Sequence, residues 1–247
     1  MAARPALAAL ILTLAAPAGA PAQSPAPGVF TPPPGCQGFL TVQSRGCRVS
    51  NHYRCAADAP GDQWRADFDQ DGPYFVSRID AEGQWVESYD LFPTQRQVLD
   101  PGPEDAQGFS TLLAEGIDTF AFGLSRDTGE TSRVRGFDRL TGAEVVIDGI
   151  PLRQTEFEFT ETYADGSLKR RARGREYIHP DWRLFFAGPS EWDGGDGFVA
   201  YDGSPVQFVF PGEPGFMATE PLYECDAILS RLPLSPLPKE DTCHDDL

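Results

Sequence analysis

The sequence predicts an all-β fold: an antiparallel β-meander that forms a curved sheet, a barrel or a sandwich, with one short helix. Extended runs rich in aromatic and β-branched residues recur along the chain. Turn signals such as Asp71-Gly72, Thr141-Gly142 and Asp165-Gly166 divide these runs at intervals of roughly 8 to 15 residues, which is typical of hairpins. Such short connections leave no room for the crossover helices of a parallel sheet.

Both ends of the chain differ in composition from its centre. Residues 1–22 resemble a secretory signal peptide, with Arg4, a short apolar stretch and an A-x-A site before Gln23. The apolar stretch is too short to cross a membrane, so we expect no membrane span. We then expect a proline-rich linker over 23–35, an antiparallel β domain over 36–225 and a proline-rich acidic tail over 226–247.

The formal net charge of −17 argues against nucleic acid and anionic membrane surfaces as partners. Arginine far outnumbers lysine, which occurs only as Lys169 and Lys239, while alanine, proline and glycine are abundant. This composition is typical of a GC-rich bacterial genome. Together with the leader, it predicts a periplasmic or secreted protein.

The first hairpin follows from Arg45-Gly46. If these two residues form the turn, Val42 pairs with Val49 and Leu40 with Asn51. The same count brings Cys36 opposite Cys55, close enough for a disulfide.

All five cysteines follow the leader, and an oxidising compartment favours disulfides between them. Cys47 lies at the turn end of the hairpin and can bond only a distant residue. We predict the pairs Cys36–Cys55 and Cys47–Cys225, with Cys243 as the free thiol. The alternative is a bond between Cys225 and Cys243.

The elements after this hairpin follow from their turn residues. Three strands are expected, and residues 93–102 then break the pattern because of their prolines and glycines. A short helix is predicted over 104–114, with Glu104 and Asp105 in its first turn and Gly116 at its end. Strands resume at Ile117. The expected strands are 63–69, 74–79, 84–91, 117–125, 132–138, 143–148, 152–163, 168–178, 183–187, 198–201 and 206–210.

The hairpin around Asp165-Gly166 shows the clearest pairing. Counting outward from the turn places Phe159 opposite Ala172, Phe157 opposite Gly174 and Glu158 opposite Arg173. The phenylalanine face is expected to meet the core and the charged face to meet solvent. Glu161 and Arg170 share the core side near the turn, so we expect this end of the hairpin to extend beyond the core.

One stretch matches the start of a calcium-binding loop. Asp67, Asp69 and Asp71 alternate before Gly72, as the first ligands of such a loop do. The twelfth position, where a bidentate glutamate is required, is Arg78. An ordinary acidic hairpin turn is therefore the favoured interpretation, and calcium at Asp67, Asp69 and Asp71 is the alternative.

Little in the sequence indicates catalysis. It contains three histidines, no G-x-S-x-G or H-E-x-x-H motif and no cysteine pair with metal-site spacing. We therefore expect a protein that is not an enzyme and needs no cofactor. Abundant carboxylates keep a periplasmic hydrolase as an alternative.

The favoured function is binding of a small apolar or lipid-like ligand, since a curling sheet can enclose an apolar pocket. The predicted pocket residues are Phe120, Phe122, Phe157 and Phe159, and a filled core is the alternative role for each. In general pattern, though in no motif, the chain is similar to exported bacterial β-meander proteins that bind such ligands. A structural envelope protein that binds another protein through an edge strand is a further alternative.

Overall fold

The computed structural model describes residues 28–225, and within them thirteen strands form a single antiparallel sheet. The all-β class and the meander are therefore confirmed. The predicted leader, residues 23–27 of the predicted linker and the predicted tail from 226 onward, with Cys243, lie outside the described residues. The elements are β1 (Cys36–Ser44), β2 (Arg48–Cys55), β3 (Gln63–Asp69), β4 (Gly72–Ile79), β5 (Trp85–Leu91), β6 (Thr94–Leu99), α1 (Phe109–Glu115), β7 (Ile117–Arg126), β8 (Thr131–Ile147), β9 (Ile150–Tyr163), β10 (Leu168–His179), β11 (Leu184–Asp193), β12 (Val199–Asp202) and β13 (Pro205–Val209).

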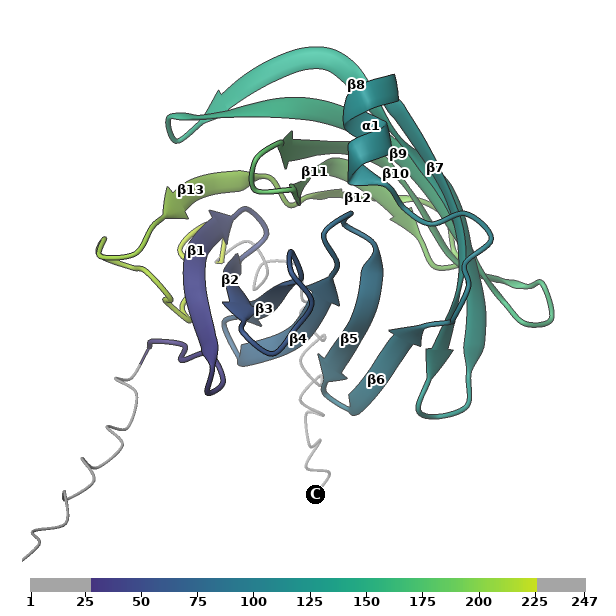
Figure 1. Cartoon of the computed structure of the whole chain (residues 1–247), viewed down its shortest axis with the longest axis horizontal. Coiled ribbons are helices and arrows are strands. Elements are labelled where there is room, and N and C mark those ends of the chain that lie inside the picture. The colour runs from purple at the N-terminus through teal and green to yellow at the C-terminus, as the bar shows by residue number, and fades with distance from the viewer. Residues whose placement is uncertain (1–27, 226–247) are drawn as a thin grey trace, which may run out of the picture.

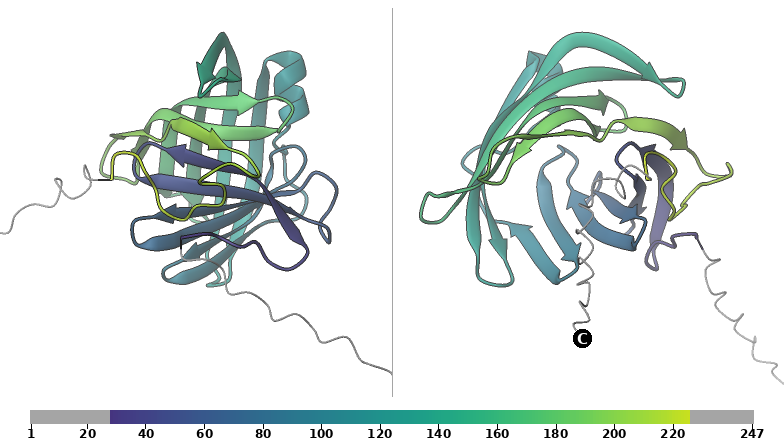
Figure 2. Two further views of the ribbon diagram at one scale, coloured as in Figure 1. Left: turned by 90° about the vertical axis from the view of Figure 1, so that its left-hand side faces the viewer. Right: turned by 180° about the vertical axis from the view of Figure 1, so that it is seen from behind.

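The sheet is one strongly curved layer (Figures 1 and 2). Each strand from β1 to β12 pairs with the next, and β13 then pairs with β1 at the opposite edge. Since β12 and β13 do not pair, the hydrogen bonding leaves the sheet open. The chain nevertheless passes between the two edges through Gly203 and Ser204 alone, so the edges lie close together.

The β1–β2 hairpin departs from the register that a two-residue turn predicts. Its turn has three residues, and both Gly46 and Cys47 have positive φ, so Val42 pairs with Ser50 and Leu40 with His52. A bulge between Gly38 and Leu40 then restores the count, and Cys36 lies opposite Cys55 as predicted. The pairings expected for Val42 and Leu40 were wrong because one extra residue in the turn shifts each partner by one.

The β9–β10 hairpin has a similar correction at its turn. Tyr163 N donates to Ser167 O, and Gly166 has a φ of 84°, as in a three-residue loop with a bulge. A second irregularity between Leu168 and Arg170 restores the predicted register. The expected pairs Phe159–Ala172, Phe157–Gly174 and Glu158–Arg173 are all present.

Three other boundaries differ from prediction. The helix begins at Phe109 rather than at residue 104, because residue 105 pairs with Ala121 as an isolated bridge, and it ends at Gly116 as expected. Residues 94–99, predicted to be irregular, form β6. Residues 132–138 and 143–147 belong to the single long strand β8, interrupted by an irregularity near Gly142, and residue 148 lies in the turn that follows.

Both faces of the first strands are covered. On the concave face, Leu40 and Val42 pack against Phe186 and Phe208. On the convex face, Phe30 covers Tyr53 and Phe68, with ring centroids 5.7 and 5.4 Å apart. The apolar residues of β2 and β3 therefore lie in a second, outer core.

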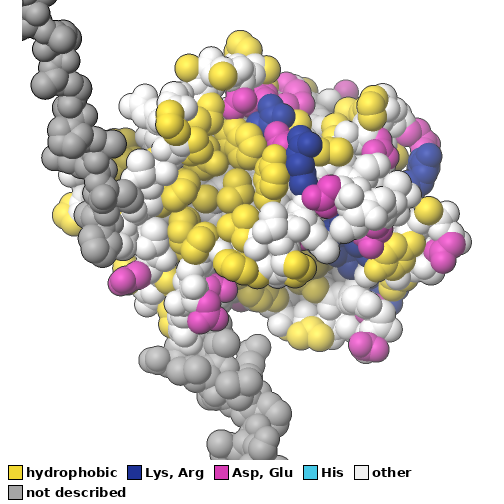
Figure 3. Space-filling model, turned by 90° about the horizontal axis from the view of Figure 1, so that it is seen from below, with side chains coloured by type: hydrophobic (Ala, Val, Ile, Leu, Met, Phe, Trp, Pro, Cys, Tyr) yellow, Lys and Arg dark blue, Asp and Glu magenta, His cyan; other side chains and the backbone are white. Residues whose placement is uncertain are grey.

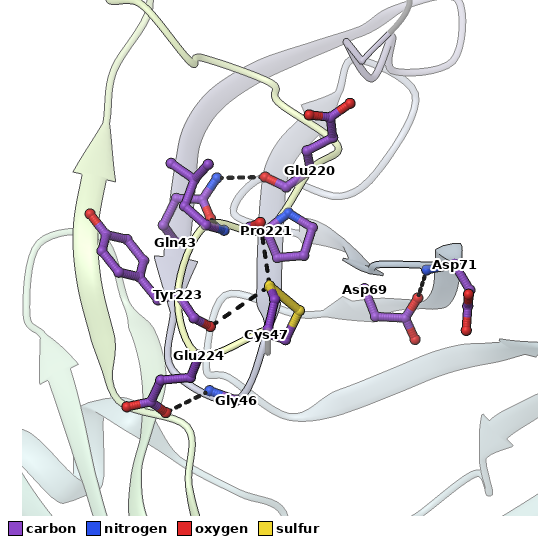
Figure 4. The surroundings of a disulfide bond; sticks show 11 residues. Gln43, Gly46, Cys47, Asp69, Asp71, Glu220, Pro221, Tyr223 and Glu224 are labelled. Atoms are coloured by element: carbon purple, nitrogen blue, oxygen red, sulfur yellow. Dashed lines mark hydrogen bonds between the residues drawn. A yellow bond between two sulfur atoms is a disulfide. The ribbon is translucent and has the colours of Figure 1, made fainter. Parts of the chain in front are cut away.

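The segment of residues 217–225 runs along the convex side of β1 and β2 (Figure 4). Gln43 donates to Glu220 O at 3.1 Å and accepts from Leu222 N at 3.0 Å, and Cys47 N donates to Tyr223 O. The bond between Cys47 and Cys225 ties the segment to the β1–β2 turn. This bond and Cys36–Cys55 are the two disulfides that the sequence predicts.

Candidate functional site

The concave side of the sheet encloses a cavity of about 350 Å³. Side chains from β2 through β11 line it, because alternate residues of each strand point to the same face. The volume lies within the range of cavities that hold small ligands. This cavity is the candidate binding site.

Four phenylalanines form one wall of the cavity: Phe120 and Phe122 on β7, and Phe157 and Phe159 on β9. They are the four pocket residues that the sequence predicts, and the structure brings them together in one buried cluster. Gly136 on β8 makes this packing feasible, since a Cβ there would lie 2.7 Å from the Phe120 ring and 2.4 Å from Glu158 O. Their role in ligand binding stays a prediction.

Two partly exposed tryptophans line the cavity. Trp85 on β5 and Trp192 on β11 line it and are still 38% and 37% exposed. Their ring centroids lie 6.4 and 5.6 Å from that of Phe159. The guanidinium carbon of Arg170 lies 5.9 Å from the Trp85 ring and 6.0 Å from the Trp192 ring, within reach of cation–π attraction.

Arg170 is fixed by a carboxylate behind it. Glu161 is fully buried and accepts hydrogen bonds of 2.6 Å from both Arg170 Nε and the Ser132 hydroxyl, while Lys169 Nζ lies 3.1 Å away. Burial alone would raise the pKa of Glu161, but these partners outweigh it and hold the pKa below its usual value. Residues 163–167 at the turn are exposed, as expected for a hairpin end that extends beyond the core. Glu161 itself lies within the core, because its ion pair with the partly exposed Arg170 allows the carboxylate to be buried.

Two more carboxyl groups lie further along the cavity. Asp138 on β8 pairs with Phe157, and Glu176 on β10 pairs with Thr155, the next residue of β9 on the same face. Gln107 donates a hydrogen bond to Asp138 at 3.0 Å. Gln107 leads into α1, whose Phe109 packs on Phe185, and Phe185 lines the same cavity as the two acids. The end of the cavity near α1 is therefore polar.

These two acids differ from ordinary surface carboxylates. Burial raises the pKa of Asp138 to about 7, and burial together with the nearby Asp138 raises the pKa of Glu176 to about 8. Glu176 retains some accessible surface because it borders the cavity. At neutral pH the pair therefore holds protons that it can donate in hydrogen bonds.

The wall formed by β2 and β3 carries basic groups. Arg48 and His52 on β2 and Arg65 on β3 line the cavity. Asp67 lies beside them and accepts a 2.6 Å hydrogen bond from Ser50. Burial lowers the pKa of His52 to about 3, with Arg65 adding to the effect, so its imidazole is neutral at physiological pH.

The sequence did not identify these polar cavity residues. Gln63, Arg65 and Asp67 alternate along β3 with Trp64, Ala66 and Phe68, which suggests a solvated polar face opposite an apolar core face. In the structure the polar face points into the cavity, and the outer core covers the apolar face. Apolar cover on the convex side, supplied by Phe30, is the feature that local alternation does not reveal.

The structure gives no support to a calcium loop at Asp67, Asp69 and Asp71. Asp67 is buried against Ser50 and Arg65, whereas Asp69 accepts a hydrogen bond from Asp71 N within the β3–β4 turn (Figure 4). Over residues 28–225, no group of three or more acidic, histidine or cysteine side chains has an arrangement that could hold a metal ion.

The outer surface also carries apolar side chains. Phe92, Val146 and Val199 are among the most exposed, and hydrophobic side chains gather on one side of the face in Figure 3, beside acidic and basic ones. Val199 belongs to the edge strand β12. The alternative function, binding a protein at an exposed edge, concerns this surface.

Comparisons with protein-family models, with curated proteins and with solved structures found no match to this chain. Across the described part of the chain, no helix is long and apolar enough to cross a membrane. The cavity is therefore the feature of this chain that bears most directly on its function.

Proposed function

We propose that this chain is an exported binding protein that holds a small, largely apolar or lipid-like ligand in the cavity of its curved sheet. The observation that carries the proposal is the cavity of about 350 Å³ with its wall of four phenylalanines. Aromatic rings offer large apolar area at low entropic cost, and burial contributes roughly 25 cal/mol per Å². A ligand with an apolar body therefore gains most from this wall.

Two disulfides support the exported location, because such bonds persist in oxidising compartments such as the periplasm. One of them closes a short hairpin, and the other joins residues 178 positions apart. The leader adds to this argument from the sequence alone.

One specific observation favours a second candidate, a hydrolase. Asp138 and Glu176 share the cavity, and two carboxyl groups with raised pKa values are suited to general acid and base catalysis. Structural polar networks also raise pKa values, so the pair alone is weaker support than the aromatic wall. If Glu176→Gln abolishes a hydrolytic activity while ligand binding persists, the chain is an enzyme.

The test of binding uses a matched pair of variants in β8. Val134 lines the cavity and is buried, whereas Val146 on the same strand is 71% exposed. Val134→Phe places a ring in the cavity and should weaken binding of the neutral fluorophore N-phenyl-naphthylamine by about tenfold or more, whereas Val146→Phe should leave it unchanged.

Native mass spectrometry of the full chain, purified from its own host, is the companion measurement. A bound small apolar molecule supports the proposal, and a bound protein chain supports the edge-strand alternative. If the purified protein is empty and the wild type does not bind the fluorophore, the cavity is not a binding site.

A further inference from the structure

The cavity is not equally apolar at all points. The phenylalanine wall of β7 and β9 leads toward Thr155, Glu176 and Asp138, and Arg48 and Arg65 come from the wall of β2 and β3. Arg65 is among the charges that affect the pKa of Glu176. Acidic and basic groups from different walls therefore meet in one polar region of the cavity.

Hydrogen bonding in this region is incomplete. In the described part of the chain, the buried side-chain polar atoms without a hydrogen-bond partner are Arg48 Nε, Arg65 Nε and Thr155 Oγ1. Arg65 Nε lies 3.1 Å from Asp67 Oδ2, but the alignment is too poor for a hydrogen bond. Native proteins rarely leave such groups unpaired, and two of these atoms belong to arginines that line the cavity, so this wall has hydrogen-bonding capacity that the chain itself does not use.

Charge in this region is also unbalanced. Asp67 is the carboxylate next to both Arg48 and Arg65, and it is already engaged by Ser50. Asp67 raises the pKa of Arg48 against the effect of burial, so the guanidinium keeps its charge. Among residues 28–225, no ion pair joins Asp138 or Glu176 to an arginine. Two guanidiniums thus share one carboxylate.

The other arginines that line the cavity have carboxylate partners. Arg78 pairs with Glu87, Arg126 with Asp90, and Arg170 with Glu161. His52 is neutral because burial lowers its pKa to about 3. The excess positive charge is therefore confined to Arg48 and Arg65.

We infer that the ligand is an amphiphile with a carboxylate head group, bound with its head between Arg65 and Glu176 and its chain along the four phenylalanines. A carboxylate accepts hydrogen bonds from a guanidinium and from a protonated Glu176, and it neutralises the excess charge. A neutral head group would leave this charge in place, and an ammonium group would add to it. The inference rests on the proposed function of the cavity as a binding site.

The experiment compares three amphiphiles that share one chain and differ in the head group: dodecanoic acid, dodecanol and dodecylamine. Each displaces N-phenyl-naphthylamine from the full chain at pH 7. The acid should bind about tenfold or more tightly than the alcohol, since hydrogen bonds to charged groups are the stronger ones. The amine should bind most weakly.

Arg65→Gln should remove the preference for the acid and leave the affinity for dodecanol unchanged, so dodecanol binding also reports that the pocket is folded. Arg173→Gln is the matched control, because Arg173 lies on the outer face and pairs with Glu191. If Arg65→Gln does not fold, Arg48→Gln takes its place, with the same loss expected.

The outcomes separate the two proposals. Equal binding of acid and alcohol by the wild type, or a preference for the amine, overturns the carboxylate head group but leaves the apolar pocket. Unchanged preference for the acid in a folded Arg65→Gln or Arg48→Gln protein also overturns the inference. Failure of all three amphiphiles to bind overturns the proposed function itself.

Discussion

Glu161 is a charged residue in a fully buried environment. It is fully buried, and Arg170, Lys169 and Ser132 engage its carboxylate. Glu161→Ala removes the partner of two cations and should lower the free energy of unfolding by about 3 kcal/mol. Glu158→Ala, an exposed position on the same strand, should change it by less than about 0.5 kcal/mol. Urea unfolding of both variants measures the difference, and equal values would contradict the buried network.

Glu176 predicts an unusual dependence of stability on pH. Folding raises its pKa from 4.5 to about 8, so between these values the folded protein keeps a proton that the unfolded chain has released. Stability therefore falls as the pH rises through this window. Glu176→Gln removes the penalty and should stabilise the protein by about 4 kcal/mol at pH 8 and very little at pH 4. Thermal unfolding at both pH values tests this, and a gain that is the same at both would refute the assignment.

Residue pairing shows what the sequence could and could not predict at this scale. The count from Asp165-Gly166 correctly placed Arg173 opposite Glu158. The guanidinium nevertheless pairs with Glu191 on β11, at 2.9 Å. Backbone register follows from local turn chemistry, whereas a long side chain chooses among all strands within its reach.

At the scale of elements, the two disulfides should contribute unequally. Cys36 and Cys55 are 19 residues apart, whereas Cys47 and Cys225 are 178 apart. In the chain-entropy model, the first bond contributes about 3 kcal/mol and the second about 5 kcal/mol. The comparison uses two variants, one with Cys36 and Cys55 replaced by serine and the other with Cys47 and Cys225 replaced by serine. Both variants also carry Cys243→Ser, so that no further thiol can form a new disulfide. A larger loss from the Cys36/Cys55 variant than from the Cys47/Cys225 variant would show that the 217–225 segment is held mainly by its hydrogen bonds.

Bulges explain most errors in the predicted elements. An extra residue at Gly46-Cys47 shifts the β1–β2 pairing, and a bulge at Phe39 shifts it back, so the cysteine pair was predicted correctly although the valine pair was not. Turn signals locate a hairpin, but they do not fix the number of residues in its loop. The helix start was wrong for a related reason, since the bridge between Asp105 and Ala121 extends residues with good helix propensity.

At the scale of the whole molecule, the sequence predicts the aromatic wall of the cavity but not its basic wall. The aromatic wall lies on two hairpins whose alternation is visible in the sequence. The basic wall depends on contacts between distant segments, because Phe30 must cover the outer face of β2 and β3 before their polar face can turn inward. Such nonlocal contacts leave no local pattern.

Closure of the sheet also depends on distant contacts. The edges formed by β12 and β13 are not hydrogen-bonded to each other, and the β1–β2 turn lies against the link between them. Arg45 N donates to Ser204 O at 2.9 Å, and Arg48 Nη2 donates to Gly203 O at 3.2 Å. We call these contacts at residues 203 and 204 the seam.

The last prediction concerns this seam. A Cβ at Gly203 would lie 2.7 Å from the Tyr201 ring, 3.1 Å from Ala187 Cβ and 3.3 Å from Arg48 Nη2. Gly203→Val must therefore push the edges apart, and it should lower the free energy of unfolding by about 1 to 3 kcal/mol. Gly194→Val is the control, because nothing lies within 4 Å of a Cβ there. Urea unfolding compares the two variants. Because Arg48 also lines the cavity, displacement of the seam should speed release of the bound fluorophore. Equal stability and equal release rates in the two variants would mean that the seam does not hold the sheet closed.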